Sequence, residues 1–345
     1  MRFGMIGSGS WGTAIVKILT DNQQSLNWWI RNPDTINHLK KRKHNPQYLS
    51  SVYFDTALLS LSHELEKTIR DSECLIIAVP SAYIEELFEK LPSDIFAGKK
   101  ILSAVKGILP GRNLLLNDWL KEKFKFDTDQ YFTVMGPCHA EEIAAEKLSY
   151  LTFSGVDENK TREIAAAFST DYLNVITNND IYGVQYAAVL KNIYALASGI
   201  AHGLEYGDNF LSVLIANCAD EMAGFLLKAG ISHIEVGIHD APESGQIKKS
   251  ANYAASVYLG DLLVTCYSIF SRNRKFGNMI GKGYSVSTAK LELNMVAEGY
   301  NGSHCIHYIN EQLKADIPIA ETIYKILWKN LNVREGFKQI EGILV

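Results

Sequence analysis

The chain has 345 residues, 47% of them hydrophobic, which is enough for about two domains with apolar cores. A formal net charge of -4 argues against nucleic acid or another polyanion as a partner. The five cysteines lack metal-site spacing and no segment resembles a signal peptide, so we expect a cytoplasmic protein with no metal ion and no membrane span.

The chain starts with an apolar strand over residues 3–6, a glycine-rich turn and an amphipathic helix. Gly7, Gly9 and Gly12 give the pattern G-x-G-x-x-G between strand and helix. In this pattern the first glycine permits a tight turn, the second lets the backbone approach a pyrophosphate, and the third lets the helix pack against the strand. The helix N-terminus then directs N–H groups and a positive dipole end at the phosphates, so the segment predicts a dinucleotide site.

A second strand over residues 26–30 ends at Arg31. An Asp or Glu at this place binds the ribose 2′-hydroxyl of NAD, whereas an arginine accepts the 2′-phosphate of NADP. Arg31 therefore favours NADPH, and nearby Asp34 leaves NADH open.

Further apolar runs alternate with helical segments up to about residue 177, which predicts a doubly wound parallel sheet. The predicted strands cover 74–79, 101–105, 131–135, 151–154 and 175–176, and the helices between them include 83–91 and 113–124. Ligands of such sheets bind beyond the carboxyl ends of the strands, where Gly7, Pro80, Lys106 and Gly136 are expected. For Lys106, a surface loop is an equally good interpretation.

Residues 181–204 form an apolar helical segment with one formally charged residue, Lys191. Gln185, Lys191 and Asn192 near its middle favour a buried helix over a membrane span. An unpaired ammonium is costly there, so Lys191 is expected to serve a site, and burial would adjust its pKa for proton transfer.

Asp261 and Thr265 are predicted to lie one helical turn apart on one face. The cluster Ser271-Arg272-Asn273-Arg274-Lys275 follows, and its donors suit a phosphate, although a solvated basic loop is the commoner meaning of such a run. Residues 237–254 show no assignable pattern, and His304 and His307 have no metal ligand at usable spacing.

Seven sequence blocks in order resemble the bacterial-type NAD(P)-dependent sn-glycerol-3-phosphate dehydrogenases over nearly the whole chain. The blocks are GSGSWGTA (7–14), SAVKGI (103–108), GPCHAEE (136–142), AAVLKNIYALASGIAHGLEYGDN (187–209), LGDLLVTC (259–266), SRNRKFG (271–277) and VAEGY (296–300). The resemblance implies a Rossmann-like α/β domain over residues 1–177 and an all-α substrate and catalytic domain over 178–345. It also implies NADPH or NADH as cofactor, a site between the domains, a homodimer, and supply of glycerol 3-phosphate for phospholipid synthesis.

The resemblance also implies roles for individual residues. The dinucleotide contacts are Gly7, Gly9, Ser10, Trp11, Gly12, Arg31, Lys106, Ala140, Arg272, Val296 and Glu298, and the substrate contacts are Lys106, Gly136, Cys138, Lys191, Asp261, Ser271, Arg272 and Asn273. Lys191 is the proton-transfer residue, assisted by Lys106 and held by Asp261. Thr265 and Asn192 complete the hydrogen bonds of its ammonium, while Arg272 and Asn273 anchor the substrate phosphate.

Two departures from the family pattern stand out. Cys138 replaces the usual Ser or Thr, and residues 255–258 replace a small, glycine-rich approach to the Gly260-Asp261 pair. Two other functions are compatible with a dinucleotide-binding domain followed by a helical domain. One is a β-hydroxyacid or sugar-nucleotide dehydrogenase of similar build, and the other is a nucleotide-sensing regulatory protein without turnover.

Overall fold

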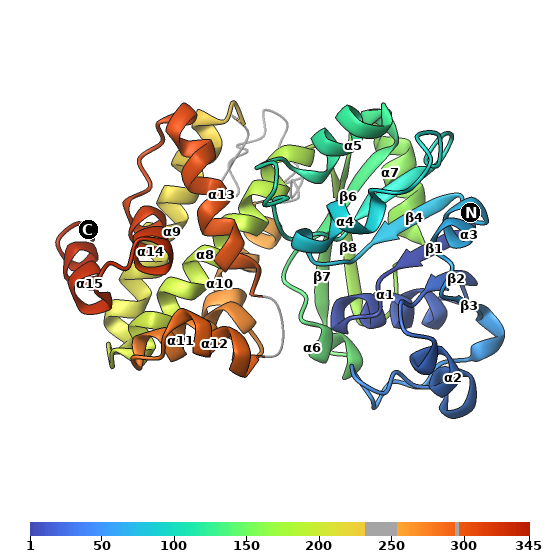
Figure 1. The fold of residues 1–345 in the computed structure, drawn as a ribbon, viewed down its shortest axis with the longest axis horizontal. Helices are drawn as coiled ribbons and strands as arrows, with labels where there is room; N and C mark the ends of the chain where they lie inside the picture. The colour runs from blue at the N-terminus through green and yellow to red at the C-terminus, as the bar shows by residue number, and fades with distance from the viewer. Residues whose placement is uncertain (232–253, 294–296) are drawn as a thin grey trace, which may run out of the picture. The chain divides into compact units, whose positions relative to one another are not determined.

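The computed structural model describes residues 1–231, 254–293 and 297–345, and its contacts divide the chain into two units (Figure 1). Unit 1 comprises residues 1–105 and 114–181 and holds all eight described strands. Unit 2 comprises residues 106–113 and 182–345, and its described elements are helical. The predicted fold class, an α/β region followed by an all-α region, is confirmed.

The sheet of unit 1 has the strand order β3-β2-β1-β4-β5-β6-β7-β8. The strands are β1 (Phe3–Ile6), β2 (Leu26–Trp29), β3 (Leu59–Ser62), β4 (Cys74–Ile77), β5 (Lys100–Ser103), β6 (Tyr131–Met135), β7 (Ser149–Gly155) and β8 (Leu173–Asn178). The strands that we predicted begin and end within two residues of these bounds. The edge strand β3 was not predicted, because its sequence LSLS is short and half polar.

The sheet is parallel, as predicted, except at one pair, since β6 and β7 run antiparallel. A parallel return needs a crossover that travels the length of the sheet, usually on a full helix. The link from β6 to β7 contains only the five-residue helix α6 (Ala140–Ala144), so the chain turns back at the edge where β6 ended. The longer α7 (Glu158–Ala166) then restores parallel pairing between β7 and β8.

The strands at the centre of the sheet are buried along their whole length. Every residue of β1, β4 and β6 is buried, which explains why these strands are continuous apolar runs without alternation. The remaining helices of unit 1 are α1 (Ser10–Asp21), α2 (Pro33–Arg42), α3 (Leu65–Arg70), α4 (Ile84–Phe88) and α5 (Leu116–Phe124), with 3₁₀ turns η1 (Thr56–Leu58), η2 (Ser81–Tyr83) and η3 (Thr128–Gln130).

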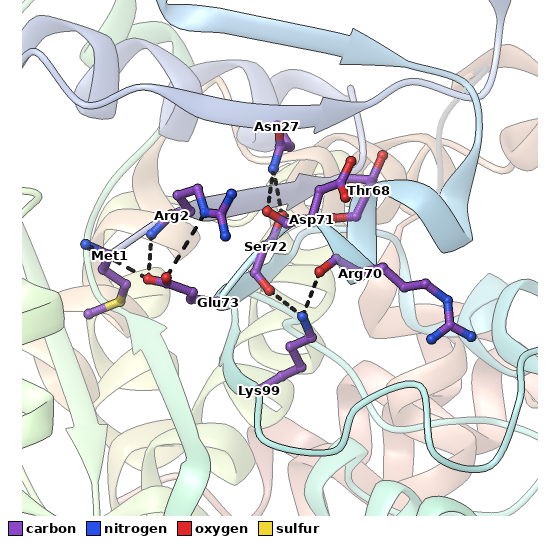
Figure 2. A network of polar contacts seen from close by, with 9 residues as sticks. All are labelled: Met1, Arg2, Asn27, Thr68, Arg70, Asp71, Ser72, Glu73 and Lys99. Carbon is purple, nitrogen blue, oxygen red and sulfur yellow. Dashed lines mark hydrogen bonds and ion pairs between the residues drawn. The ribbon is translucent and has the colours of Figure 1, made fainter.

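Figure 2 shows a polar network near the amino ends of β1, β2 and β4. The Glu73 carboxylate accepts a hydrogen bond from the Arg2 N–H at 2.9 Å, and the Asn27 amide donates to the Ser72 hydroxyl at 3.0 Å. Lys99 Nζ donates to the Ser72 carbonyl at 2.6 Å, which places a cation at the C-terminal end of α3. These contacts tie down the amino end of the sheet, while ligands of such folds bind at the opposite, carboxyl end.

Unit 2 is built on the long helix predicted over residues 181–204. The helices are α8 (Ile181–Gly203), α9 (Asp208–Lys228), α10 (Asp261–Tyr267), α11 (Arg272–Gly281), α12 (Val286–Leu293), α13 (Glu298–Leu313), α14 (Pro318–Trp328) and α15 (Val333–Glu341), and the π-helical stretch η4 (Ala254–Gly260) runs into α10. Most of the unpatterned region 237–254 lies outside the described residues.

Among the described residues, α9 is the one helix long and apolar enough to cross a membrane. Its Glu221 is buried and accepts hydrogen bonds from the N–H groups of Ile319 at 2.5 Å and Ala320 at 3.2 Å. These donors belong to the first turn of α14, where a helix has no internal partners for its N–H groups. Because these contacts bind α9 to α14, we interpret α9 as a helix of the bundle.

Helices α8 and α11 touch through their backbones. A Cβ atom added to Gly199 would overlap the carbonyl oxygen of Arg274, and one added to Gly277 would overlap that of Leu196. Gly203 and Gly281 repeat the arrangement one turn along each helix. The glycines therefore hold the first turn of α11, which carries the predicted phosphate cluster, against α8, which carries Lys191.

We predict that Gly277→Ala destabilises the protein by about 3 kcal/mol, because neither backbone can move aside for the new methyl group. The matched control is Gly224→Ala in α9, where a Cβ atom has nothing within 4 Å. That change is expected to be neutral or stabilising by up to about 1 kcal/mol through helix propensity. Urea unfolding of both variants checks this, and equal stabilities would contradict the packing argument.

Candidate active site

The three glycines of the N-terminal turn have the environments that their predicted roles require. Gly7 has a φ of +118°, and a Cβ atom there would lie 2.6 Å from the carbonyl oxygen of Ala78. A Cβ atom on Gly12 would lie 2.6 Å from the Gly7 carbonyl, so this glycine lets α1 approach β1. A Cβ atom added to Gly9 would have nothing within 4 Å, which leaves space for a ligand on that side of the residue.

The start of α1 fits a pyrophosphate. Its N-cap residue is Gly9, so no side chain caps the first N–H groups of the helix. Free N–H groups at the positive end of a helix dipole bind anions. Ser10 is buried and Trp11 half-buried in this first turn, and Arg31 follows β2 with its side chain exposed.

Other predicted residues of unit 1 lie after β6. Gly136 has a φ of +131°, and a Cβ atom there would lie 2.7 Å from the Tyr150 carbonyl, so this position requires glycine. Cys138 and Ala140 are buried where α6 begins. The Cys138 thiol is therefore buried at the position where the family pattern has the hydroxyl group of Ser or Thr.

Lys191 of α8 forms an ion pair with Asp261 of α10. Both residues are buried, with exposed fractions of 3% and 2%. A buried charge is tolerated when an opposite charge compensates its lost hydration. The predicted pairing of these two residues is therefore present within unit 2.

Burial lowers the pKa of Lys191 from 10.5 to about 8, although the Asp261 carboxylate opposes the shift. The positive charge of Lys106 contributes to this lowering. A lysine with a pKa near 8 exchanges its proton readily close to neutral pH, which an ordinary surface lysine does not. The pair therefore has the electrostatics of a proton-transfer site.

The amide groups of Asn192 and Asn273 join three elements of unit 2. Asn192 Nδ2 donates to the Lys106 carbonyl at 3.2 Å, and Asn273 Nδ2 donates to Asn192 Oδ1 at 2.9 Å. Asn273 Oδ1 accepts from the N–H of Gly299 at 3.0 Å. These bonds were not predicted from the sequence. Contact of Asn192 with the lysine ammonium and of Asn273 with the substrate phosphate stays a prediction.

Thr265 also makes a bond that we did not predict. Its hydroxyl donates to the carbonyl oxygen of Asp261 one turn earlier, at 2.5 Å. The π-helical stretch η4 ends at Gly260, immediately before Asp261. Such stretches are frequent at functional sites because they change the angular position of the side chains that follow.

The predicted phosphate cluster forms the N-terminus of α11. Ser271 is its N-cap, and its hydroxyl accepts a hydrogen bond from the Arg274 N–H at 3.2 Å. Arg272 is the first residue of the helix, and its side chain is exposed. A guanidinium beside a helix N-terminus combines two attractions for a phosphate group.

Three remaining predictions concern residues near α13. Val296 lies outside the described residues, and Glu298 is the first residue of α13. His307 Nδ1 lies 2.8 Å from the Glu321 carboxylate, so it pairs within the helical unit. No cluster of potential metal ligands occurs in the described ranges.

Two residues that contact the glycine turn were not predicted. The Trp28 indole N–H donates to the Gly7 carbonyl, and the Asn45 amide donates to the Ser8 carbonyl. The pair Asn45-Pro46 is a turn signal that draws attention to the loop, but only the folded structure shows which segment it contacts.

Known proteins resemble this chain in both its N-terminal and its C-terminal part. The family models for the N-terminus and the C-terminus of NAD-dependent glycerol-3-phosphate dehydrogenase match residues 2–161 and 180–338. A glycerol-3-phosphate dehydrogenase [NAD(P)+] of Carboxydothermus hydrogenoformans is 32% identical over 97% of this chain and 95% of its own length. That of Macrococcus caseolyticus is 30% identical over 99% and 97%. The crystal structure of glycerol-3-phosphate dehydrogenase from Coxiella burnetii matches with a TM-score of 0.85 at 23% identity, covering 98% of each chain.

We predict that Asp261→Asn costs about 1 kcal/mol of stability at pH 7, because the Lys191 ammonium loses its counter-ion and must release its proton, which costs about 1.4 kcal/mol per unit between its pKa of about 8 and the pH. A lysine whose pKa is lowered on folding adds stability as pH rises from its folded pKa to its unfolded value. The variant lowers the folded pKa of Lys191 further, so its deficit is expected to shrink from pH 7 to pH 10. Urea unfolding across this range measures it. In a Lys191→Met background Asp261→Asn should cost much less, and an equal cost there would contradict the pairing.

Proposed function

The chain belongs to the NAD-dependent glycerol-3-phosphate dehydrogenase family, and we propose that Lys191 is the proton-transfer residue of its NAD(P)H-dependent interconversion of dihydroxyacetone phosphate and sn-glycerol 3-phosphate. The observation that carries the proposal is the buried ion pair between Lys191 and Asp261. Its ammonium has both a stabilising carboxylate and a pKa of about 8.

The reduction of the ketone requires a hydride at C2 and a proton on the oxygen. A bound NADH or NADPH supplies the hydride. The Lys191 ammonium donates a hydrogen bond to the ketone oxygen and transfers its proton as negative charge develops there. Asp261 holds the ammonium and stabilises its charge before transfer. In the reverse direction neutral Lys191 accepts the hydroxyl proton.

The substrate phosphate is proposed to bind at the N-terminus of α11. Arg272 supplies a charged fork of donors, and Ser271 fixes the start of the helix by capping it. Asn273 is proposed as a substrate contact as well, although its amide already bonds to Asn192 and Gly299. Phosphate binding then orients the distant carbonyl toward the reacting groups.

The Asn192 amide is proposed to act indirectly. Its bond to the Lys106 carbonyl fixes the segment that carries the Lys106 ammonium. Lys106 in turn lowers the pKa of Lys191 through its charge. Lys106 and Thr265 stay among the proposed catalytic residues, together with the pair itself.

The dinucleotide is proposed to bind in the region 1–177, with its pyrophosphate at the turn between β1 and α1. The proposed contacts are Gly7, Gly9, Ser10, Trp11, Gly12, Arg31, Lys106, Ala140, Arg272, Val296 and Glu298, and the proposed substrate contacts also include Gly136 and Cys138. Residues 178–345 are the proposed substrate and catalytic domain. The exposed guanidinium of Arg31 supports use of NADPH.

We also propose a cytoplasmic homodimer that supplies glycerol 3-phosphate for phospholipid synthesis. All five cysteines are free and buried, as in proteins of reducing compartments. Large apolar side chains on the surface of unit 2, such as Ile269 and Leu291, are suited to burial between subunits.

We predict that Lys191→Met lowers kcat for reduction of dihydroxyacetone phosphate by about 10³-fold, because the general acid is lost. Fluorescence titration should show NADH or NADPH still bound, since Lys191 is not a proposed dinucleotide contact. In the wild type, kcat for reduction should fall above about pH 8, where Lys191 loses its proton, while the oxidation rate rises. Turnover near that of the wild type in the variant would refute the assignment.

We predict that Arg272→Ala raises KM for dihydroxyacetone phosphate by about 10- to 100-fold, the range expected for a lost charged hydrogen bond. The control is Lys282→Ala, which removes an exposed charge at the opposite end of the same helix and should leave KM unchanged. Unphosphorylated dihydroxyacetone should be a poor substrate of the wild type and of both variants. Equal use of the two ketones by the wild type would contradict a phosphate site.

A further inference from the structure

The carbonyl groups that begin the glycine turn are held by buried side chains from two other segments. Trp28 Nε1 donates to the Gly7 carbonyl at 2.9 Å, from the interior of β2. Asn45 Nδ2 donates to the Ser8 carbonyl at 3.0 Å, from the loop after α2. Trp28 and Asn45 are at most 1% exposed, so water does not compete for these bonds.

Both donors are themselves held in place. The Trp28 ring packs edge-on against Phe54 with centroids 5.6 Å apart. Asn45 Oδ1 accepts from the N–H groups of Gln47 at 3.0 Å and Tyr48 at 3.3 Å, and its amide also donates to the Thr13 hydroxyl at 2.9 Å. Each donor therefore has a fixed position relative to the turn.

Holding a carbonyl also orients the N–H group of the same peptide. A peptide unit is planar, and in the trans form its C=O and N–H point in opposite directions. None of the described peptide bonds is cis. Fixing the Gly7 and Ser8 carbonyls thus directs the N–H groups of Ser8 and Gly9 away from Trp28 and Asn45.

One of those two N–H groups belongs to Gly9, beside which there is space. Gly9 has nothing within 4 Å of its Cβ position, and it is also the N-cap of α1. Glycine loses more backbone freedom on ordering than other residues, so an unbraced turn would have to be ordered by the ligand. Bracing removes that cost before the ligand arrives.

We propose that Trp28 and Asn45 are positioning residues that pre-orient the N–H groups of the glycine turn for the pyrophosphate of the dinucleotide. The inference rests on the dinucleotide binding of the proposed function. It predicts that each side chain affects binding of the pyrophosphate and leaves binding of the adenosine part unchanged.

Each of two variants removes one donor to the turn, and Asn45→Ser also removes the bond of the amide to the Thr13 hydroxyl. Trp28→Phe keeps an aromatic ring against Phe54 and lacks the N–H group. Asn45→Ser keeps an uncharged oxygen that accepts from the Gln47 N–H and is too short to reach the Ser8 carbonyl. The matched control is Asn332→Ser, which shortens an asparagine that caps α15 in unit 2.

NADH and NADPH binding is measured by fluorescence titration, and ADP-ribose and adenosine are measured as competitors. Each test variant should bind the dinucleotide and ADP-ribose about tenfold more weakly, as expected for one lost hydrogen bond, with adenosine unchanged. Asn332→Ser should bind all ligands like the wild type. Thermal unfolding identifies a test variant that has lost its fold. The binding data of the other test variant then test the positioning role.

The binding results distinguish a failure of the proposed function from a failure of the positioning role. Wild-type protein that binds neither dinucleotide would overturn the proposed function. Wild-type binding with unchanged affinity in both test variants would overturn the positioning role alone. Equal weakening of adenosine and ADP-ribose would also overturn it, since that pattern reports a general disturbance of the domain.

Discussion

The chemistry that we propose for this chain depends on one pair of opposite charges buried inside a helical unit. Removing Lys191 and Asp261 from water is unfavourable, and their mutual attraction offsets that only at close contact. Two helices must therefore hold the pair firmly. The result is an ammonium whose pKa lies near 8, which suits the proton transfer that we propose for it.

Two sets of glycines provide the backbone geometry that the proposed chemistry needs. In unit 2, Gly199 and Gly277 let α8 and α11 touch, which brings Asn273 within reach of Asn192. In unit 1, Gly7 and Gly12 let strand and helix approach, and Gly9 keeps the backbone between them open. Small residues thus fix the distances, and side chains with charge or amide groups act at those distances.

Much of the fold could be predicted from the sequence because local residue patterns determine the strands and helices. Strong apolar runs identified the central strands, and the position of Lys191 within an apolar helix indicated a buried amine. The antiparallel β7 was missed because strand direction depends on the length of helix α6, which apolar patterns do not reveal. The bonds of the Asn192 amide to Lys106 and Asn273 were not predicted, since they involve residues 86 and 81 positions away.

The residues that sequence patterns miss share a physical property. Lys191 and the glycines are visible because their types are unusual where they occur, whereas Trp28 and Asn45 look like an ordinary core residue and an ordinary turn residue. Each acts through a single hydrogen bond to a backbone carbonyl, and every residue has such a carbonyl. No residue type in the sequence therefore identifies the acceptor. A ligand site made of backbone N–H groups is defined as much by what holds the opposite side of each peptide as by the glycines that expose it.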